Sequence, residues 1–145
     1  MPTPVIVRPA SEHDWPVLEL IFQLSRQAAF HWQSSADFIQ GQLRAQSEGE
    51  CIWVAEENDG RIVGFVSVWP ANDFIHHLYT APDRQGLGIG PALLRALPDW
   101  GQRRYTLKCL ALNLPARRFY DRQGFQALEL GDGEDGPYWL LAHPA

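Results

Sequence analysis

Apolar residues recur along the chain in two rhythms, which predict a mixed sheet with helices on its faces. Short β-branched and aromatic runs between turn residues predict strands, and apolar residues spaced three and four apart predict helices. The predicted strands are Val5–Arg8, Cys51–Glu56, Ile62–Trp69, Asp73–Thr80, Tyr105–Leu112, Phe125–Leu130 and Tyr138–Ala142. The predicted helices are Ser11–Ala29, Ser35–Ser47, Pro91–Leu97 and Asn113–Gln123. This order indicates an α/β protein with a mixed sheet.

One crossover connection sets the direction of two predicted strands. Glu57–Gly60 is a hairpin turn, so the strands on either side of it should be antiparallel. Asp73–Thr80 is instead followed by a helix and then by Tyr105–Leu112, an order typical of parallel neighbours. The sheet should therefore change from antiparallel to parallel between these two strands.

Length, composition and charge narrow the class of protein. With 145 residues, 46% of them hydrophobic and 20% charged, residues 1–145 are expected to form a single globular domain. A net charge of −5 argues against a nucleic-acid partner, which requires a basic face. Cys51 and Cys109 form no CxxC pair, so neither a disulfide nor a zinc site is expected. The chain shows no signal peptide and no membrane-length apolar run, so a cytoplasmic location is expected.

A glycine-rich turn is the clearest candidate for ligand binding. Gln85-Gly86-Leu87-Gly88-Ile89-Gly90 follows a predicted strand and precedes a predicted helix. Glycines let the backbone approach a ligand closely, and a helix start offers free N–H groups to a phosphate. Pro91 follows Gly90 where a P-loop has Lys, and the alternate spacing of the glycines differs from a Rossmann fingerprint.

Two motifs resemble those of the GNAT N-acetyltransferase superfamily. Gln85-x-x-Gly88-x-Gly90 is similar to that family's acetyl-coenzyme A signature, Q/R-x-x-G-x-G/A. Asn113-x-x-Ala116-x-x-Phe119-Tyr120-x-x-x-Gly124-Phe125 resembles its second block, an Asn-capped helix that ends in a Gly-Phe strand start. The predicted order of elements fits the family over nearly the whole chain.

The resemblance implies a fold, an activity and a set of coenzyme contacts. The expected fold is a six- to seven-stranded mixed sheet with two splayed parallel strands and about four helices. The expected activity is acetyl transfer from acetyl-coenzyme A to a primary amine of a small molecule or of a peptide or protein. The strand backbone should face the pantetheine arm, the glycine turn should hold the pyrophosphate, and Asn113 should touch the coenzyme. The coenzyme-binding residues that the resemblance implies are Leu78, Tyr79, Thr80, Gln85, Gly86, Leu87, Gly88, Ile89, Gly90 and Asn113. Pro91 departs from this scheme because it has no N–H to donate.

Tyr120 is the candidate that would protonate the leaving thiolate. It occupies the position at which many family members carry a tyrosine near the sulfur. A thiol with an ordinary pKa near 8.5 leaves more readily when a phenol donates a proton or a hydrogen bond. Packing beside Phe119 in an amphipathic helix is the alternative reading. Asn113 has two expected roles as well, that of helix N-cap and that of a coenzyme contact.

The general base is left open between several groups. Some family members carry a Glu where this chain has Phe74. Two residues further on, His76 resembles the catalytic histidines of arylalkylamine-type acetyltransferases, and imidazole accepts protons near neutral pH. A water chain, Asp73 and Glu56 are the alternatives. Strand alternation should direct His76 and His77 to opposite faces, with Ile75 beside His77, so a shared metal is not expected.

The acceptor pocket and the partners are less defined. Phe30, Trp32 and His76 are the candidate pocket residues, with Phe38 close by, and the acidic hairpin after Glu129 could attract a cation. Half of the basic residues lie between Arg103 and Arg122, where they could meet coenzyme phosphates. A homodimer is compatible with the sequence.

The alternative function is a coenzyme A-binding regulatory module with weak or no catalysis. A nucleotide-binding α/β protein is a third possible function.

Overall fold

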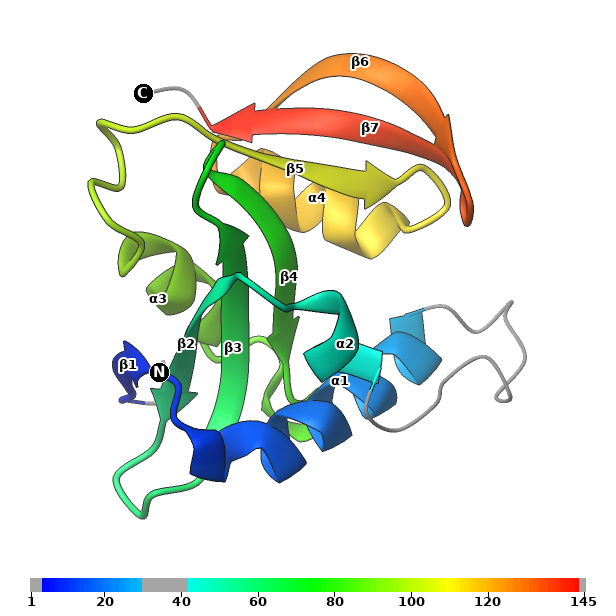
Figure 1. Cartoon of the computed structure of the whole chain (residues 1–145). Coiled ribbons are helices and arrows are strands. Elements are labelled where there is room, and N and C mark those ends of the chain that lie inside the picture. The colour runs from blue at the N-terminus through cyan, green and yellow to red at the C-terminus, as the bar shows by residue number, and fades with distance from the viewer. Residues whose placement is uncertain (1–3, 30–41, 144–145) are drawn as a thin grey trace.

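A computed structural model describes residues 4–29 and 42–143 of the chain. Their strands form one seven-stranded sheet in the order β1-β2-β3-β4-β5-β7-β6 (Figure 1). The strands are β1 (Ile6–Pro9), β2 (Cys51–Glu56), β3 (Ile62–Trp69), β4 (Phe74–Thr80), β5 (Tyr105–Leu110), β6 (Gln126–Gly133) and β7 (Gly136–His143). All neighbouring strands are antiparallel except β4 and β5, which are parallel. The predicted fold class and the predicted change of direction are confirmed.

The helices follow the predicted order but differ at their ends. They are α1 (Trp15–Ala29), α2 (Gln42–Gln46), α3 (Ile89–Arg95) and α4 (Leu114–Arg122). A 3-10 turn at Glu12–Asp14 precedes α1, so the α-helix begins later than predicted. Only the second part of the predicted helix Ser35–Ser47 falls within the described residues, where it forms α2. None of the helices in the described ranges is long and apolar enough to cross a membrane.

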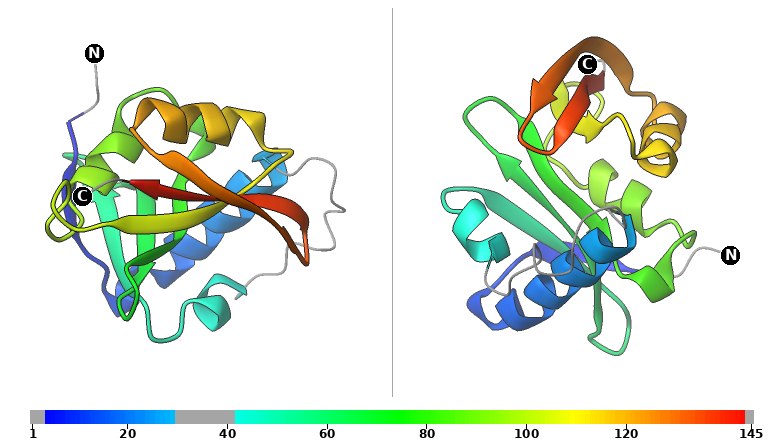
Figure 2. Two further views of the ribbon diagram at one scale, coloured as in Figure 1. Left: turned by 90° about the horizontal axis from the view of Figure 1, so that it is seen from above. Right: turned by 90° about the vertical axis from the view of Figure 1, so that its right-hand side faces the viewer.

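Two apolar clusters hold helices against opposite faces of the part of the sheet formed by β1 to β4 (Figure 2). Burying one large apolar side chain stabilises the folded state by about 1.5–3 kcal/mol. One cluster joins α1 and α2 to β2 and β3 through Leu18, Ile21, Phe22, Leu43, Val54 and Phe65. The other joins α3 to β3 and β4 through Val63, Val66, Ile75, Leu93 and Leu94.

The parallel strands β4 and β5 separate after a very short ladder. They pair only at Phe74 with Thr106 and at Ile75 with Leu107. Further along, β4 stays paired with β3 as far as Thr80, whereas β5 turns away from it toward β7 (Figure 1). The N–H and C=O groups that β4 directs toward β5 are therefore without a strand partner beyond Ile75. The predicted splay of the two parallel strands is confirmed.

A β-bulge interrupts the alternation of side chains along β4. Ser67 pairs with His77 and the next residue, Val68, pairs with Ile75, so His76 is the extra residue. As a result Ile75 packs in the cluster of α3, while His77 lies against Phe22 of α1. The prediction that Ile75 shares a face with His77, and that strict alternation separates His76 from His77, is therefore wrong.

Candidate active site

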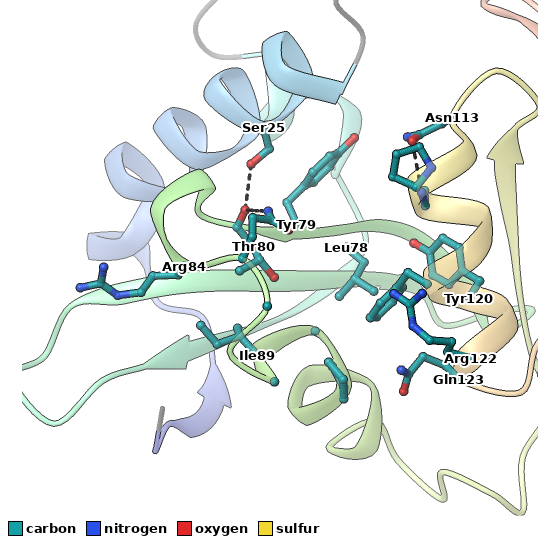
Figure 3. A pocket seen from close by; sticks show the side chains of 18 residues that line it. Ser25, Leu78, Tyr79, Thr80, Arg84, Ile89, Asn113, Tyr120, Arg122 and Gln123 are labelled. Atoms are coloured by element: carbon teal, nitrogen blue, oxygen red, sulfur yellow. Dashed lines mark hydrogen bonds between the residues drawn. The ribbon is translucent and has the colours of Figure 1, made fainter. Parts of the chain in front are cut away.

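A cleft of about 520 Å³ lies between β4 and α4 and is closed at one end by the glycine turn (Figure 3). We call it the β4–α4 cleft. Its lining comes from α1 (Ser25), β4 (Leu78, Tyr79, Thr80), the turn and α3 (Arg84, Gln85, Gly86, Gly88, Ile89, Gly90, Pro91) and the α4 segment (Asn113, Pro115, Ala116, Phe119, Tyr120, Arg122, Gln123). Nine of the ten predicted coenzyme-binding residues thus lie together; the tenth, Leu87, packs against the core instead. Their binding roles stay predictions.

Glycine is required in the turn for two different reasons. Gly86 and Gly88 have φ values of 76° and 81°, in the left-handed region that residues with a side chain rarely adopt. Gly88 is also the N-cap of α3, which therefore begins at Ile89, before Pro91. At Gly90 the reason is space, because an added Cβ would lie 2.9 Å from Cζ of Phe119. The turn and α4 are consequently in close contact at one end of the cleft.

The carbonyl of Thr80 is the point at which three segments meet. It accepts a hydrogen bond of 3.0 Å from Nε2 of Gln85 and one of 3.2 Å from Oγ of Ser25 (Figure 3). The side chain of Gln85 thus ties the turn to the end of β4. Ser25 was not predicted as a site residue, because nothing in the sequence relates it to a strand 55 positions later.

Asn113 begins α4 as predicted. Its Oδ1 accepts a hydrogen bond of 3.3 Å from the backbone N–H of Ala116, which confirms the N-cap. Such a cap stabilises a helix by about 1 kcal/mol. Asn113 also lines the cleft, so its predicted second role as a coenzyme contact is open to it.

Tyr120 lies in the wall of the cleft formed by α4. Figure 3 shows its side chain directed from α4 toward the space beside β4. Its ring packs edge-to-face against Phe119 and Phe125, at centroid distances of 5.2 and 5.3 Å. Burial, followed by the nearby Cys109 and Tyr79, raises the pKa of the Tyr120 phenol far above its usual value. The phenol is therefore protonated at neutral pH and can donate a hydrogen bond into the cleft.

His76 contacts the carboxylate of Glu50, which no motif in the sequence indicates. Its Nδ1 lies 2.5 Å from Oε2 of Glu50, whose side chain is only 5% exposed. The His76 ring stacks on the ring of His77 at 3.9 Å, as the bulge in β4 allows. Ligand atoms of Glu50, His76 and His77 lie within 4.8 Å of one another, so the geometric reason given above against a shared metal is wrong.

Buried His77 is a neutral neighbour of this pair. Desolvation by burial, followed by the charges of His76 and Arg26, lowers its pKa to about 2. Its ring also lies edge-on to Phe22 at 5.1 Å. His77 therefore provides an uncharged wall on one side of His76.

Comparison with known proteins assigns the chain to a family. The family model described as Acetyltransferase (GNAT) family matches residues 15–125. The chain belongs to the GNAT acetyltransferase family. An uncharacterized N-acetyltransferase of Methanocaldococcus jannaschii is 37% identical to it over 106 residues, which cover 65% of this chain and 67% of that protein.

Solved structures of GNAT proteins share the fold over nearly the full chain. A GCN5-related N-acetyltransferase from Rhodopseudomonas palustris has a TM-score of 0.81 and 21% identity, and the match covers 100% of this chain and 98% of the other. The PaiA N-acetyltransferase from Thermoplasma acidophilum, solved in complex with coenzyme A, has a TM-score of 0.77 and 18% identity. That match covers 99% of this chain and 100% of the other. At these identities the likeness shows the fold alone.

Several of the predicted GNAT site residues lie away from the cleft or outside the described residues. Phe30, Trp32 and Phe38 fall within residues 30–41, outside the described part of the chain. His76 does not belong to the lining of the β4–α4 cleft. The two acidic alternatives for the base are engaged elsewhere: Glu56 lies 3.5 Å from Arg8 and Asp73 lies 3.6 Å from Arg103.

Proposed function

We propose that this GNAT protein transfers the acetyl group of acetyl-coenzyme A directly to a primary amine of a small molecule or of a peptide or protein. The observation that carries the proposal is the two-residue ladder between β4 and β5, beside a cleft of about 520 Å³. A pantetheine arm carries amide groups and can hydrogen-bond along an unpaired strand edge, as an added strand would. The coenzyme A complex of the Thermoplasma acidophilum neighbour, which has the same fold, supports this use of the cleft.

The polar end of the cleft suits the phosphates of the coenzyme. Backbone N–H groups of the turn from Gln85 to Gly90 can surround an anion, as successive amides in such turns do. Two arginines, Arg84 and Arg122, belong to the lining, and Arg122 makes no ion pair with a described residue, so its charge is available to an anion. Arg84 pairs with Glu57 at 3.0 Å and with Asp83 at 3.3 Å, which fixes its position beside the turn. Pro91 has no N–H, so the phosphates must be held by the residues that precede it.

Tyr120 would act at the leaving sulfur. Bound acetyl-coenzyme A supplies a thioester, whose carbonyl carbon an amine can attack with loss of the thiol. Because its pKa is raised, Tyr120 keeps its proton and can donate a hydrogen bond to the sulfur as negative charge develops there and the C–S bond breaks. Backbone N–H groups of Leu78 or Tyr79 would stabilise the oxygen on which negative charge develops.

His76 would take the proton of the acceptor amine. An alkylammonium group has a pKa near 10.4 and must lose a proton before it can attack. The His76 side chain is 36% exposed, so a group arriving from solvent can reach it. It lies on β4 two residues before Leu78 and outside the β4–α4 cleft, where it would not compete with the pantetheine arm.

The test combines a binding measurement with a turnover measurement. Acetyl-coenzyme A should raise the melting temperature, whereas adenine nucleotides without a pantetheine arm should have a much smaller effect. With a panel of small amines and amine-bearing peptides, free thiol should be released at least on one acceptor and in proportion to acetylated product. Tight binding without turnover on any acceptor would favour the regulatory module. Equal stabilisation by plain nucleotides would favour a nucleotide-binding protein.

A further inference from the structure

Glu50 is a nearly buried carboxylate directly before β2 that contacts a residue of β4. Its side chain is 5% exposed, and Oε2 lies 2.5 Å from Nδ1 of His76. Two lone pairs would repel each other at this distance, so a proton must lie between the two atoms. Because a carboxyl group is a stronger acid than an imidazolium, we assign this proton to Nδ1 of His76, so that Glu50 accepts a charge-assisted hydrogen bond from it.

The distance also distinguishes a hydrogen bond from a shared metal ion. Carboxylate oxygen and imidazole nitrogen each bind zinc at about 2.0–2.2 Å, which requires the two ligand atoms to stand well over 2.5 Å apart. Here Nδ1 and Oε2 are in direct contact, although His77 completes a trio of possible ligands. Glu50 and His76 therefore form a hydrogen-bonded pair.

Among residues 4–29 and 42–143, Glu50 is the charged group in direct contact with the His76 ring. On one side lies the ring of His77, which is buried and neutral. The centroid of the Phe74 ring lies 6.3 Å from that of His76, and Nζ of Lys108 lies 6.0 Å from the Phe74 centroid. Arg26 of α1 acts on His77 through its charge.

The second carboxylate oxygen of Glu50, Oε1, is buried and has no hydrogen-bond partner among the described residues. Nε2 of His77 is likewise buried and without a hydrogen bond there. Keeping a carboxylate desolvated in this way is costly, and the hydrogen bond from His76 is what offsets that cost.

We propose that Glu50 is a positioning residue for His76. By accepting the Nδ1 proton it fixes the tautomer in which the lone pair lies on Nε2, the atom that would then take the proton from the acceptor amine. On transfer the amine N–H bond breaks, the Nε2–H bond forms, and the positive charge of the imidazolium is balanced by Glu50. This inference rests on the proposed function, because it assigns His76 as the base.

The tautomer can be measured without any turnover. Long-range ¹H–¹⁵N spectra of the His76 imidazole should show the proton on Nδ1 in the unaltered protein. In Glu50→Ala the proton should move to Nε2, which neutral histidine prefers in water. Glu50→Gln keeps an acceptor oxygen and should give an intermediate spectrum, and it also provides a milder variant if Glu50→Ala does not fold. Glu12→Gln, which removes an exposed carboxylate paired with Arg44, is the matched control and should leave the spectrum unchanged.

Kinetics then connect the tautomer to the reaction. Glu50→Ala should lower kcat by about 10- to 100-fold and leave the dissociation constant of acetyl-coenzyme A unchanged, as the loss of a residue that orients a reacting histidine does. Glu50→Gln should retain more activity than Glu50→Ala. Glu12→Gln should match the unaltered protein in both constants.

Each contrary outcome has its own meaning. An Nδ1 proton that persists in Glu50→Ala would overturn the positioning role and leave the proposed function intact. A His76→Ala variant with full turnover would overturn the base assignment, and the inference with it, while the measured tautomer would still report the contact. Turnover that is lost on treatment with a chelator and restored by Zn²⁺ would overturn the inference in favour of a metal site.

Discussion

The side chain of Tyr120 combines a packing role with a proposed chemical role. Its ring lies between Phe119 and Phe125, which accounts for an aromatic residue at this position of α4. Packing alone would be satisfied by phenylalanine. Because the same apolar surroundings raise its pKa, the phenol stays protonated and can donate a hydrogen bond throughout the neutral and mildly alkaline range.

Replacing Tyr120 with Phe separates the two roles. The ring contacts remain, so we expect the dissociation constant of acetyl-coenzyme A to change by about twofold at most, while kcat falls by about 100-fold. Steady-state kinetics and calorimetry measure the two quantities. Tyr105→Phe is the control: it removes a hydroxyl that donates to the carbonyl of Pro98 at 2.6 Å, costs about 1 kcal/mol of stability and leaves turnover unchanged. An undiminished kcat in Tyr120→Phe would remove Tyr120 from the mechanism.

Asp14 contributes to stability through a bidentate contact with Arg8. Nη1 and Nη2 of Arg8 lie 2.9 and 3.1 Å from the two carboxylate oxygens, and this pairing lowers the pKa of Asp14 from 3.8 to about 2. A lowered carboxyl pKa stabilises the folded state above pH 4, and the contribution is lost as the pH falls toward 2. Asp14→Asn should therefore reduce the free energy of unfolding by about 2 kcal/mol at pH 7.

Denaturant unfolding at a series of pH values measures this contribution. The difference between Asp14→Asn and the unaltered protein should be constant from pH 7 to about 5 and shrink between about pH 4 and 2. Asp121→Asn breaks an exposed pair with Arg117 on α4 and should cost no more than about 0.5 kcal/mol. A difference for Asp14→Asn that does not depend on pH would show that the carboxylate charge is not the cause.

At the scale of elements, local patterns were sufficient wherever a strand or helix is defined by its own residues. Cys51–Glu56 and Ile62–Trp69 were predicted with the bounds that the structure has, because β-branched runs and a hairpin turn mark both ends. The bulge at His76 was not predictable, since it depends on how β3 pairs with β4. The contact between Glu50 and His76 was not predictable for the same reason, because 26 positions separate the two residues.

In the candidate site, residues within contiguous motifs were predictable, whereas residues that only the fold brings to the cleft were not. Residues of the two motifs, such as Gln85 and Asn113, could be identified because the motifs are contiguous in the chain. Arg84 and Arg122 could not be distinguished from other basic residues. Of the basic run from Arg103 to Arg122, Arg103 pairs with Asp73 and Asp99, while Arg122 lines the cleft. Charge counted along the sequence did not separate these positions.

The contact between α3 and α4 at Gly90 can be tested by one methyl group. Alanine is favoured over glycine within a helix by about 1 kcal/mol, so Gly90→Ala would be stabilising if space allowed. Here its Cβ would lie 2.9 Å from Cζ of Phe119. The ring must move, and because Phe119 lines the cleft, the affinity for acetyl-coenzyme A should fall by about tenfold without a gain in stability.

Calorimetry and thermal unfolding of Gly90→Ala measure both effects. Gly133→Ala is the control, since the nearest heavy atom to its added Cβ is 3.4 Å away, in Tyr138, an ordinary contact. That variant should bind acetyl-coenzyme A as the unaltered protein does. A Gly90→Ala variant that is more stable and binds acetyl-coenzyme A normally would show that the Phe119 ring moves away from the added methyl group without loss of stability or affinity.

At the scale of the whole molecule, the sheet consists of two halves that are joined by a short ladder. Strands β1 to β4 carry α1, α2 and α3, while β5, β6 and β7 lie together with α4 (Figures 1 and 2). The two halves share one ladder of two residue pairs between β4 and β5. A ligand that lies in the β4–α4 cleft contacts both halves, because the lining combines residues of β4, α3 and α4.

Acetyl-coenzyme A should therefore stabilise the junction in particular. At a ligand concentration about 100 times its dissociation constant, binding to the folded state adds about 2.7 kcal/mol to the free energy of unfolding. Hydrogen exchange should locate the additional protection at the backbone of Leu78–Thr80, whose groups facing β5 lack a strand partner, and at the turn Gln85–Gly90. A nucleotide without the pantetheine arm should protect only the turn. Equal protection of the Leu78–Thr80 amides by both ligands would contradict a pantetheine arm lying along β4, because only that arm can reach the strand edge.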